Sequence, residues 1–195
     1  MEASRWAPLS VEDAASLLED APFRWWISGG HALGLYMGEH WRTHEDLDIG
    51  ICRQDAREVH TWLKGWEGCV SALGELSIWD GRELEAGRNE NNIWIRRPSE
   101  EMWALDLTIN EGDDQEWIYR RDLSLRRDWD SAVCESPSGI PYLAPDLQLL
   151  FKSKDPREKD HLDAARVIPA LEDHERVFLF DHLSVGHPWL NLLQR

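Results

Sequence analysis

The chain has 195 residues, 42% of them hydrophobic, and carries a formal net charge of −16 from 21 basic and 37 acidic side chains. The length suits one domain, or a domain with a modest appendage, and the hydrophobic content supports a core. No apolar run is long enough to cross a bilayer and the N-terminus lacks a signal-peptide pattern, so we expect a cytoplasmic protein without a membrane partner. The acidic charge argues against non-specific nucleic-acid binding and is compatible with a cationic small substrate.

The first two thirds of the chain mix helical and strand patterns. Helices are expected over residues 11–20, 31–37 (closed by Gly38) and 54–65. Strands are expected over 23–28, 46–51, 75–79, 92–96, 102–109 and 116–119, separated by clusters of Gly, Asp and Asn. Residues 120–138 carry no clear pattern. This part predicts an α/β domain over residues 1–138.

The last third changes character. Residues 139–143 are expected to be a short strand or an extended link. Prolines at positions 145 and 156 stand where helix-initiating prolines would, and Pro169 ends the second of the two helices that follow. A third helix over 172–183 and a final amphipathic turn complete the chain. We therefore predict a helical segment, residues 139–195, packed on the α/β part.

One stretch, residues 28–51, organises the chain. It begins with Ser28-Gly29-Gly30, a turn that allows close approach of the backbone, and ends with Asp46-Leu47-Asp48 in an apolar run. Side chains two apart in a strand point to the same face, so the two aspartates should lie together. Neighbouring carboxylates repel unless a cation lies between them, and Mg²⁺ prefers oxygen ligands. The stretch predicts a metal site beside a phosphate-binding turn.

Asp106 is the third acidic residue of interest. It lies in the apolar, strand-like run 103–109, where a carboxylate is costly unless it is paired or bound to metal. On a strand beside Asp46 and Asp48 it completes a triad able to hold Mg²⁺ for nucleotidyl transfer, and it can take a proton from the acceptor hydroxyl. The competing interpretation is an edge-strand residue that faces water.

Two motifs together resemble a known family. Gly29-Gly30-x-Ala32, followed by Gly38-x-x-x-Arg42-x-His44-x-Asp46-x-Asp48, resembles the signature of the nucleotidyltransferase superfamily. Its form is similar to the aminoglycoside 2″-nucleotidyltransferase and lincosamide nucleotidyltransferase group of antibiotic-modifying enzymes. The C-terminal stretch from residue 140 to Pro169 resembles the helical segment of the same group.

The resemblance implies a fold and a site. It implies a mixed sheet of roughly five strands flanked by helices, with ATP or another NTP as co-substrate and Mg²⁺ as cofactor. By this likeness Asp46, Asp48 and Asp106 are the catalytic, metal-binding carboxylates. The residues implied to bind the nucleotide are Ser28, Gly29, Gly30, Arg42 and Lys152, although Lys152 can also be an ordinary exposed helix lysine. His44 is expected to shape its loop.

Three features fit the family pattern less well or lie outside it. Many relatives carry Trp-Ala-x-Asp after the glycines, whereas this chain has His31-Ala32-Leu33-Gly34. A zinc set of His31, His40, His44 and Cys52 is a weaker interpretation because no pair has a tight metal-ligand spacing. The basic pairs 120–121 and 126–127 can face a phosphate cleft, but solvated or ion-paired arginines are the simpler interpretation.

The resulting hypothesis is a Mg²⁺-dependent nucleotidyltransferase that moves AMP from ATP to a hydroxyl of a small molecule, an aminoglycoside-like antibiotic by resemblance. One alternative is a toxin-type nucleotidyltransferase acting on RNA or protein. The acidic charge argues against RNA, and a basic surface beside the carboxylates would favour it. Another alternative is a non-catalytic nucleotide-binding module.

Overall fold

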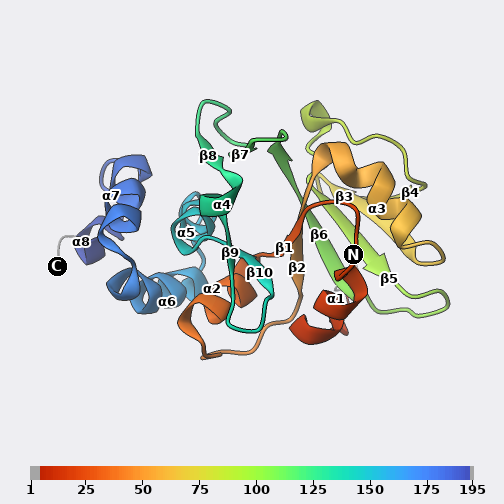
Figure 1. Cartoon of the computed structure of the whole chain (residues 1–195), viewed down its shortest axis with the longest axis horizontal. Coiled ribbons are helices and arrows are strands. Elements are labelled where there is room, and N and C mark those ends of the chain that lie inside the picture. Colours follow the sequence, from red (N-terminus) through yellow and green to blue (C-terminus); the bar gives the residue numbers. More distant parts are fainter. Residues whose placement is uncertain (1–4, 194–195) are drawn as a thin grey trace.

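A computed structural model describes residues 5–193, and its framework is one mixed β-sheet (Figure 1). The strands run in the order β4-β3-β5-β6-β2-β1-β10-β9, with β7 and β8 attached beside β6. Their bounds are β1 Trp25–Ile27, β2 Asp48–Cys52, β3 Glu67–Ala72, β4 Glu75–Trp79, β5 Asn92–Arg96, β6 Leu105–Gly112, β7 Glu116–Ile118, β8 Arg126–Asp128, β9 Val133–Glu135 and β10 Pro141–Leu143.

The centre of the sheet is buried and mixed in direction. Strand β2 pairs in parallel with β6 and antiparallel with β1, while β1 pairs in parallel with β10. Leu47, Ile49 and Ile51 alternate along this central strand and are fully buried. Alternation with a period of two places these side chains on one face, so the odd-numbered residues from 47 to 51 fix the register of the site against the core.

Three N-terminal helices pack on this part of the sheet (Figure 1). They are α1 Val11–Leu18, α2 Gly29–Met37 and α3 Ala56–Trp62. Helix α1 begins at Ser10, whose hydroxyl accepts a 3.0 Å hydrogen bond from the Asp13 N–H. Helix α2 ends at Gly38, whose φ of +68° is the left-handed conformation that a helix C-terminus favours. Both ends agree with the sequence-based predictions.

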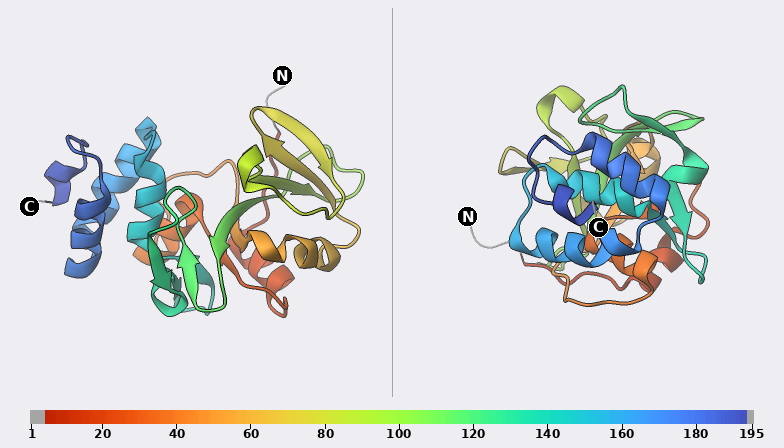
Figure 2. Two further views of the ribbon diagram at one scale, coloured as in Figure 1. Left: turned by 90° about the horizontal axis from the view of Figure 1, so that it is seen from above. Right: turned by 90° about the vertical axis from the view of Figure 1, so that its left-hand side faces the viewer.

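The remaining helices gather at one end of the molecule, away from β3, β4 and β5 (Figures 1 and 2). They are the short α4 Trp129–Ala132, then α5 Pro145–Ser153, α6 Glu158–Val167, α7 Asp173–His182 and α8 Leu190–Leu193. Their buried side chains form a second apolar cluster, which includes Leu147, Leu179 and Trp189. Pro145 occupies the first turn of α5, as its position in the sequence predicted.

The structure confirms the mixed α/β class and corrects several details. The sheet has ten strands among the described residues instead of the roughly five that the resemblance implies. Strands β3, β8 and β9 lie where no strand was predicted, and residues 141–143 form a strand, β10, that pairs with β1. Asp46 precedes strand β2, which begins at Asp48, and Gly29 begins helix α2 instead of separating it from the strand. The division at residue 138 stays a prediction; the sheet itself continues past it into β10. No helix within residues 5–193 is long and apolar enough to cross a membrane.

Candidate functional site

The Gly29 turn lies directly against the carboxylate of Asp48. Gly29 has a φ of +67°, and a Cβ atom built on it would lie 1.9 Å from Asp48 Oδ2. The Ser28 N–H donates a 2.9 Å hydrogen bond to the Asp48 carbonyl, and the Gly29 N–H donates a 2.8 Å bond to Gln148 Oε1 on α5. Only glycine fits at this position. The two hydrogen bonds join the turn to strand β2 and to helix α5.

Asp48 and Asp106 stand side by side on neighbouring strands. They are register partners in the parallel pair β2–β6, so their side chains leave the same face of the sheet. Asp46 lies two residues earlier, in the bend before β2. Asp106 is 8% exposed and accepts hydrogen bonds from Asn92 Nδ2 at 2.9 Å and from Trp94 Nε1 at 3.2 Å. Both donors come from β5, and they fix this carboxylate instead of leaving it at a water-facing edge.

Burial and mutual repulsion perturb these acids. Desolvation, followed by the charge of Asp46, raises the pKa of Asp48 to about 6. Desolvation, followed by the charge of Asp48, raises the pKa of Asp106 well above its ordinary value. Burial first, and the neighbouring carboxylates second, thus disfavour the charged forms of both acids.

This donor set fits Mg²⁺. The ligands are carboxylate oxygens from Asp46, Asp48 and Asp106, the type that hard divalent cations prefer. A cation among them would relieve the repulsion that raises the pKa of Asp48 and of Asp106. The residues predicted as metal ligands therefore fit the ion that the family resemblance implies.

A cleft of about 420 Å³ opens beside the Gly29 turn. Ser28, Gly30, Asp46 and Asp48 line it, together with Thr108 and Asn110 from β6. The cationic residues that line it are Arg42, Arg120, Arg121, Lys152, Lys154, Arg157 and Lys159. Arg120, Lys154 and Lys159 form no ion pair with any residue of the described range 5–193. A strongly acidic chain thus concentrates positive charge at one cleft.

Arg42 and Lys152, both predicted to bind nucleotide, are joined by a buried carboxylate. Arg42 donates two 2.8 Å hydrogen bonds to the oxygens of Asp163, whose side chain is fully buried. Lys152 Nζ lies 2.6 Å from Asp160 Oδ1 and 3.1 Å from Asp163 Oδ2, and its side chain is only 8% exposed. Lys152 is therefore not an ordinary exposed lysine, and both cations are held at the cleft by α6.

The zinc set considered from sequence separates into two parts. Cys52 is buried in the second apolar cluster, where desolvation raises the pKa of its thiol to about 12. His31, His40 and His44 instead gather beside α2. Desolvation and the neighbouring His31 lower the pKa of His44 to about 3, so this imidazole is neutral at physiological pH.

Several residues of the site were not predicted from the sequence. Gln148 holds the glycine turn, while Asn92 and Trp94 hold Asp106. Thr108 and Asn110 follow Asp106 at spacings of two and four along β6, which is the one signal that places them on the same face. The pair Arg120 and Arg121 was considered as able to face a phosphate cleft and does line it, whereas Lys154 and Arg157 were not singled out.

Comparison with known proteins agrees with this geometry. The model of the family described as aminoglycoside-2″-adenylyltransferase matches residues 10–99. A lincosamide resistance protein from Staphylococcus haemolyticus is 26% identical over 153 residues, which is 75% of this chain and 85% of that protein.

Two solved structures have the same fold. The lincosamide antibiotic adenylyltransferase LnuA, with lincomycin bound, superposes with a TM-score of 0.53 at 21% identity, covering 78% of this chain and 90% of that one. ANT(2″)-Ia, in complex with adenylyl-2″-tobramycin, superposes with a TM-score of 0.55 at 12% identity, covering 88% of this chain and 94% of that one.

The chain is similar in sequence to nucleotidyltransferases and shares the fold of two of them. Its similarity is to the aminoglycoside and lincosamide adenylyltransferases, the group that its two motifs resemble.

Proposed function

We propose that the chain is a Mg²⁺-dependent adenylyltransferase that transfers AMP from ATP to a hydroxyl group of a small antibiotic-like acceptor. The observation that carries this proposal is the meeting of acidic and basic groups in one cleft. Asp46 and Asp48 lie beside the Gly29 turn, and cations from three segments of the chain line the same space. A metal-bound triphosphate is the ligand whose charges match both sets.

The nucleotide is bound by the turn and the cations. Helix α2 begins at Gly29, whose N–H is held by Gln148, so the following N–H groups of the first turn and the helix dipole favour phosphate oxygens. Lys159, Lys154 and Arg120 are unpaired cations at the cleft and neutralise the β- and γ-phosphates as pyrophosphate forms. Mg²⁺ held by the carboxylates supplies charge neutralisation at the transferring phosphate.

The reaction is an in-line displacement at the α-phosphorus. The acceptor oxygen forms a bond to phosphorus, the bond to the bridging oxygen breaks, and pyrophosphate leaves with that electron pair. Asp106 takes the hydroxyl proton, since its raised pKa makes its carboxylate a better base than an ordinary aspartate. Asn92 and Trp94 hold this carboxylate in one orientation beside Asp48.

The acceptor class follows from the relatives and from charge. The names of the relatives refer to lincosamide and aminoglycoside antibiotics, and the net charge of −16 favours association with a cationic acceptor. Fold likeness alone does not fix a substrate, so both antibiotic classes belong in the test.

Modification of RNA is the second candidate, because basic side chains do lie at the cleft, the feature that would favour it. A triphosphate accounts for cations inside a cleft of this size, whereas a tRNA acceptor would require a basic surface that extends beyond it. The acidic chain as a whole therefore supports the small-molecule acceptor.

The test is pyrophosphate release from ATP and Mg²⁺ with a panel of aminoglycosides, lincosamides and bulk tRNA. The proposal predicts release that depends on one antibiotic class and is lost in Asp48→Ala, with Asp48→Asn as the variant that keeps the side-chain shape. Release that depends on tRNA would establish the second candidate. ATP binding without release for any acceptor would contradict both.

A further inference from the structure

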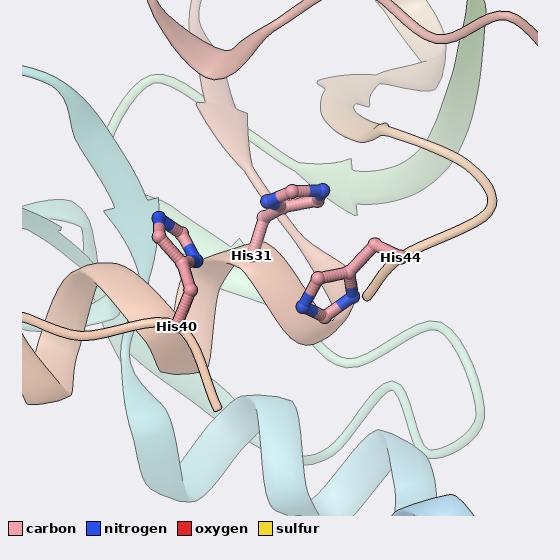
Figure 3. A group of neighbouring side chains, drawn as sticks. All are labelled: His31, His40 and His44. Atoms are coloured by element: carbon pink, nitrogen blue, oxygen red, sulfur yellow. The ribbon is translucent and has the colours of Figure 1, made fainter. Parts of the chain in front are cut away.

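Three histidines meet beside α2, and one of them, His44, also lines the cleft. His31 belongs to α2, while His40 and His44 belong to the segment 38–47 that leads from α2 to β2 (Figure 3). One ring nitrogen of each lies within 4.8 Å of the others. The ring centroid of His31 lies 4.1 Å from that of His44 and 5.8 Å from that of His40. The three rings surround a common point.

The cluster contains a buried polar atom without a partner. His31 Nδ1 is buried and forms no hydrogen bond within the described part of the chain. An unsatisfied buried polar atom costs about 1–3 kcal/mol, so such atoms are rare unless another group completes them. The rings of His40 and His44 lie beside this imidazole, but a ring nitrogen cannot be satisfied by ring contacts alone.

Two glycines make room for the rings. A Cβ atom on Gly34 would lie 2.9 Å from His40 Nδ1, and one on Gly30 would lie 2.1 Å from His44 Cε1. Gly34 is the position where many relatives are expected to carry an aspartate. The departure from the family pattern therefore coincides with the space that the His40 ring occupies.

We infer that His31, His40 and His44 form a binding site for a borderline transition-metal ion, Zn²⁺ by preference. Imidazole nitrogen suits Zn²⁺, and three protein ligands leave a fourth tetrahedral position for water. Zinc–nitrogen bonds of about 2.0–2.1 Å require nitrogens about 3.4 Å apart, so small ring rotations close the present spacing. Nitrogen ligands distinguish this site from the oxygen ligands of the Asp48 site.

Such an ion would join segment 38–47 to α2. That segment carries Arg42, which binds Asp163, and it ends beside Asp46. The ion thus fixes a loop that contributes Arg42, His44 and Asp46 to the cleft. The site does not depend on the proposed reaction, since binding can be measured without ATP or acceptor.

The test is titration of metal-free, tag-free protein with Co²⁺ as a spectroscopic probe, in excess Mg²⁺ to occupy the carboxylates. The expected result is one equivalent of Co²⁺ with the strong visible absorption of tetrahedral coordination, displaced by one equivalent of Zn²⁺. His40→Ala, an exposed position that leaves the core intact, should weaken Zn²⁺ binding at least tenfold. His174→Ala is the matched control, because His174 is exposed on α7 and should leave the affinity unchanged.

Asp48→Asn separates the two metal sites and should keep the cobalt spectrum. The inference is overturned if no saturable tetrahedral spectrum appears, or if His40→Ala retains the affinity of the unsubstituted chain. Loss of the spectrum in Asp48→Asn would likewise overturn it, since the ion would then reside at the carboxylates.

Discussion

Asp48 and Asp106 are register partners on the parallel strands β2 and β6, and burial raises the pKa of both carboxyl groups. Asp48 receives its main electrostatic repulsion from Asp46, and Asp106 from Asp48. A protein keeps such an arrangement at a cost in stability, and this cost is typical of a functional site.

That cost should be measurable as a pH dependence of stability. The pKa of Asp48 is about 6 in the folded protein and 3.8 ordinarily, so the folded state binds more protons between these values. The free energy of unfolding of the metal-free protein should therefore fall as the pH rises from about 4 to about 6. Asp48→Asn should raise it by about 1–2 kcal/mol at pH 7, as measured by urea denaturation. A destabilised variant at pH 7 would contradict this account.

Mg²⁺ should offset the same repulsion. Addition of Mg²⁺ should raise the Tm of the unsubstituted chain at pH 7 and have little effect at pH 4.5, where Asp48 is largely protonated. Asp48→Asn should lose most of the shift. An equal shift at both pH values would indicate that the ion binds elsewhere.

The Gly29 turn gives a prediction with a closely matched control. Gly29 and Gly38 have φ values of +67° and +68°, so alanine costs about 1–2 kcal/mol of backbone strain at either position. A Cβ at Gly29 would meet Asp48 Oδ2, whereas nothing lies within 4 Å of one at Gly38. Gly29→Ala should therefore abolish nucleotide binding in calorimetry, while Gly38→Ala should only lower the Tm. Similar nucleotide affinities in the two variants would show that the close approach of Gly29 to Asp48 is not needed for nucleotide binding.

Buried and exposed ion pairs should differ in their contribution to stability. Asp163→Asn leaves Arg42 and Lys152 without their common partner in a buried position, so a loss of about 3 kcal/mol is expected. Glu39→Gln removes the exposed pair with Arg166 and should cost less than about 1 kcal/mol. Chemical denaturation of both variants gives the comparison, and equal losses would contradict it.

Lys159 tests the contribution of the cleft cations to nucleotide binding. Lys159→Ala should raise the KM for ATP about 5- to 30-fold, which corresponds to about 1–2 kcal/mol, because an unpaired cation is lost from the phosphate side. Lys64→Ala, at an exposed lysine outside the cleft, should leave the KM unchanged. The kcat of both variants should stay within a few-fold of the unsubstituted chain. An unchanged KM in Lys159→Ala would remove this residue from the site.

The local signals in the sequence were sufficient for much of the fold. These signals act within a few residues. Gly38 predicted the end of α2, Pro145 predicted the start of α5, and the alternation from Leu47 to Ile51 predicted strand β2. Strands β3, β8 and β9 were missed because they are short or weakly apolar and are stabilised by their partners in the sheet.

The site was predictable where residues are close in sequence and less so elsewhere. Asp46 and Asp48 are two residues apart in the chain, and Asp106 stands out as an acid in an apolar run. Gln148, Asn92 and the cleft cations come from distant segments, and only the pairing of strands and helices brings them together. The zinc set was a weaker interpretation because its residues lack a tight sequence spacing. Segment 38–47 folds back beside α2, and this brings His40 and His44 close to His31 in space.

The fate of the α-phosphate tests the central claim most directly. The protein is incubated with Mg²⁺, an active acceptor and ATP labelled at either the α- or the γ-phosphorus. The account predicts that the α-label moves to the acceptor, that the γ-label leaves as pyrophosphate, and that Asp106→Asn slows both at least 100-fold. Transfer of the γ-label to the acceptor would contradict it, because the chain would then be a kinase instead of a nucleotidyltransferase.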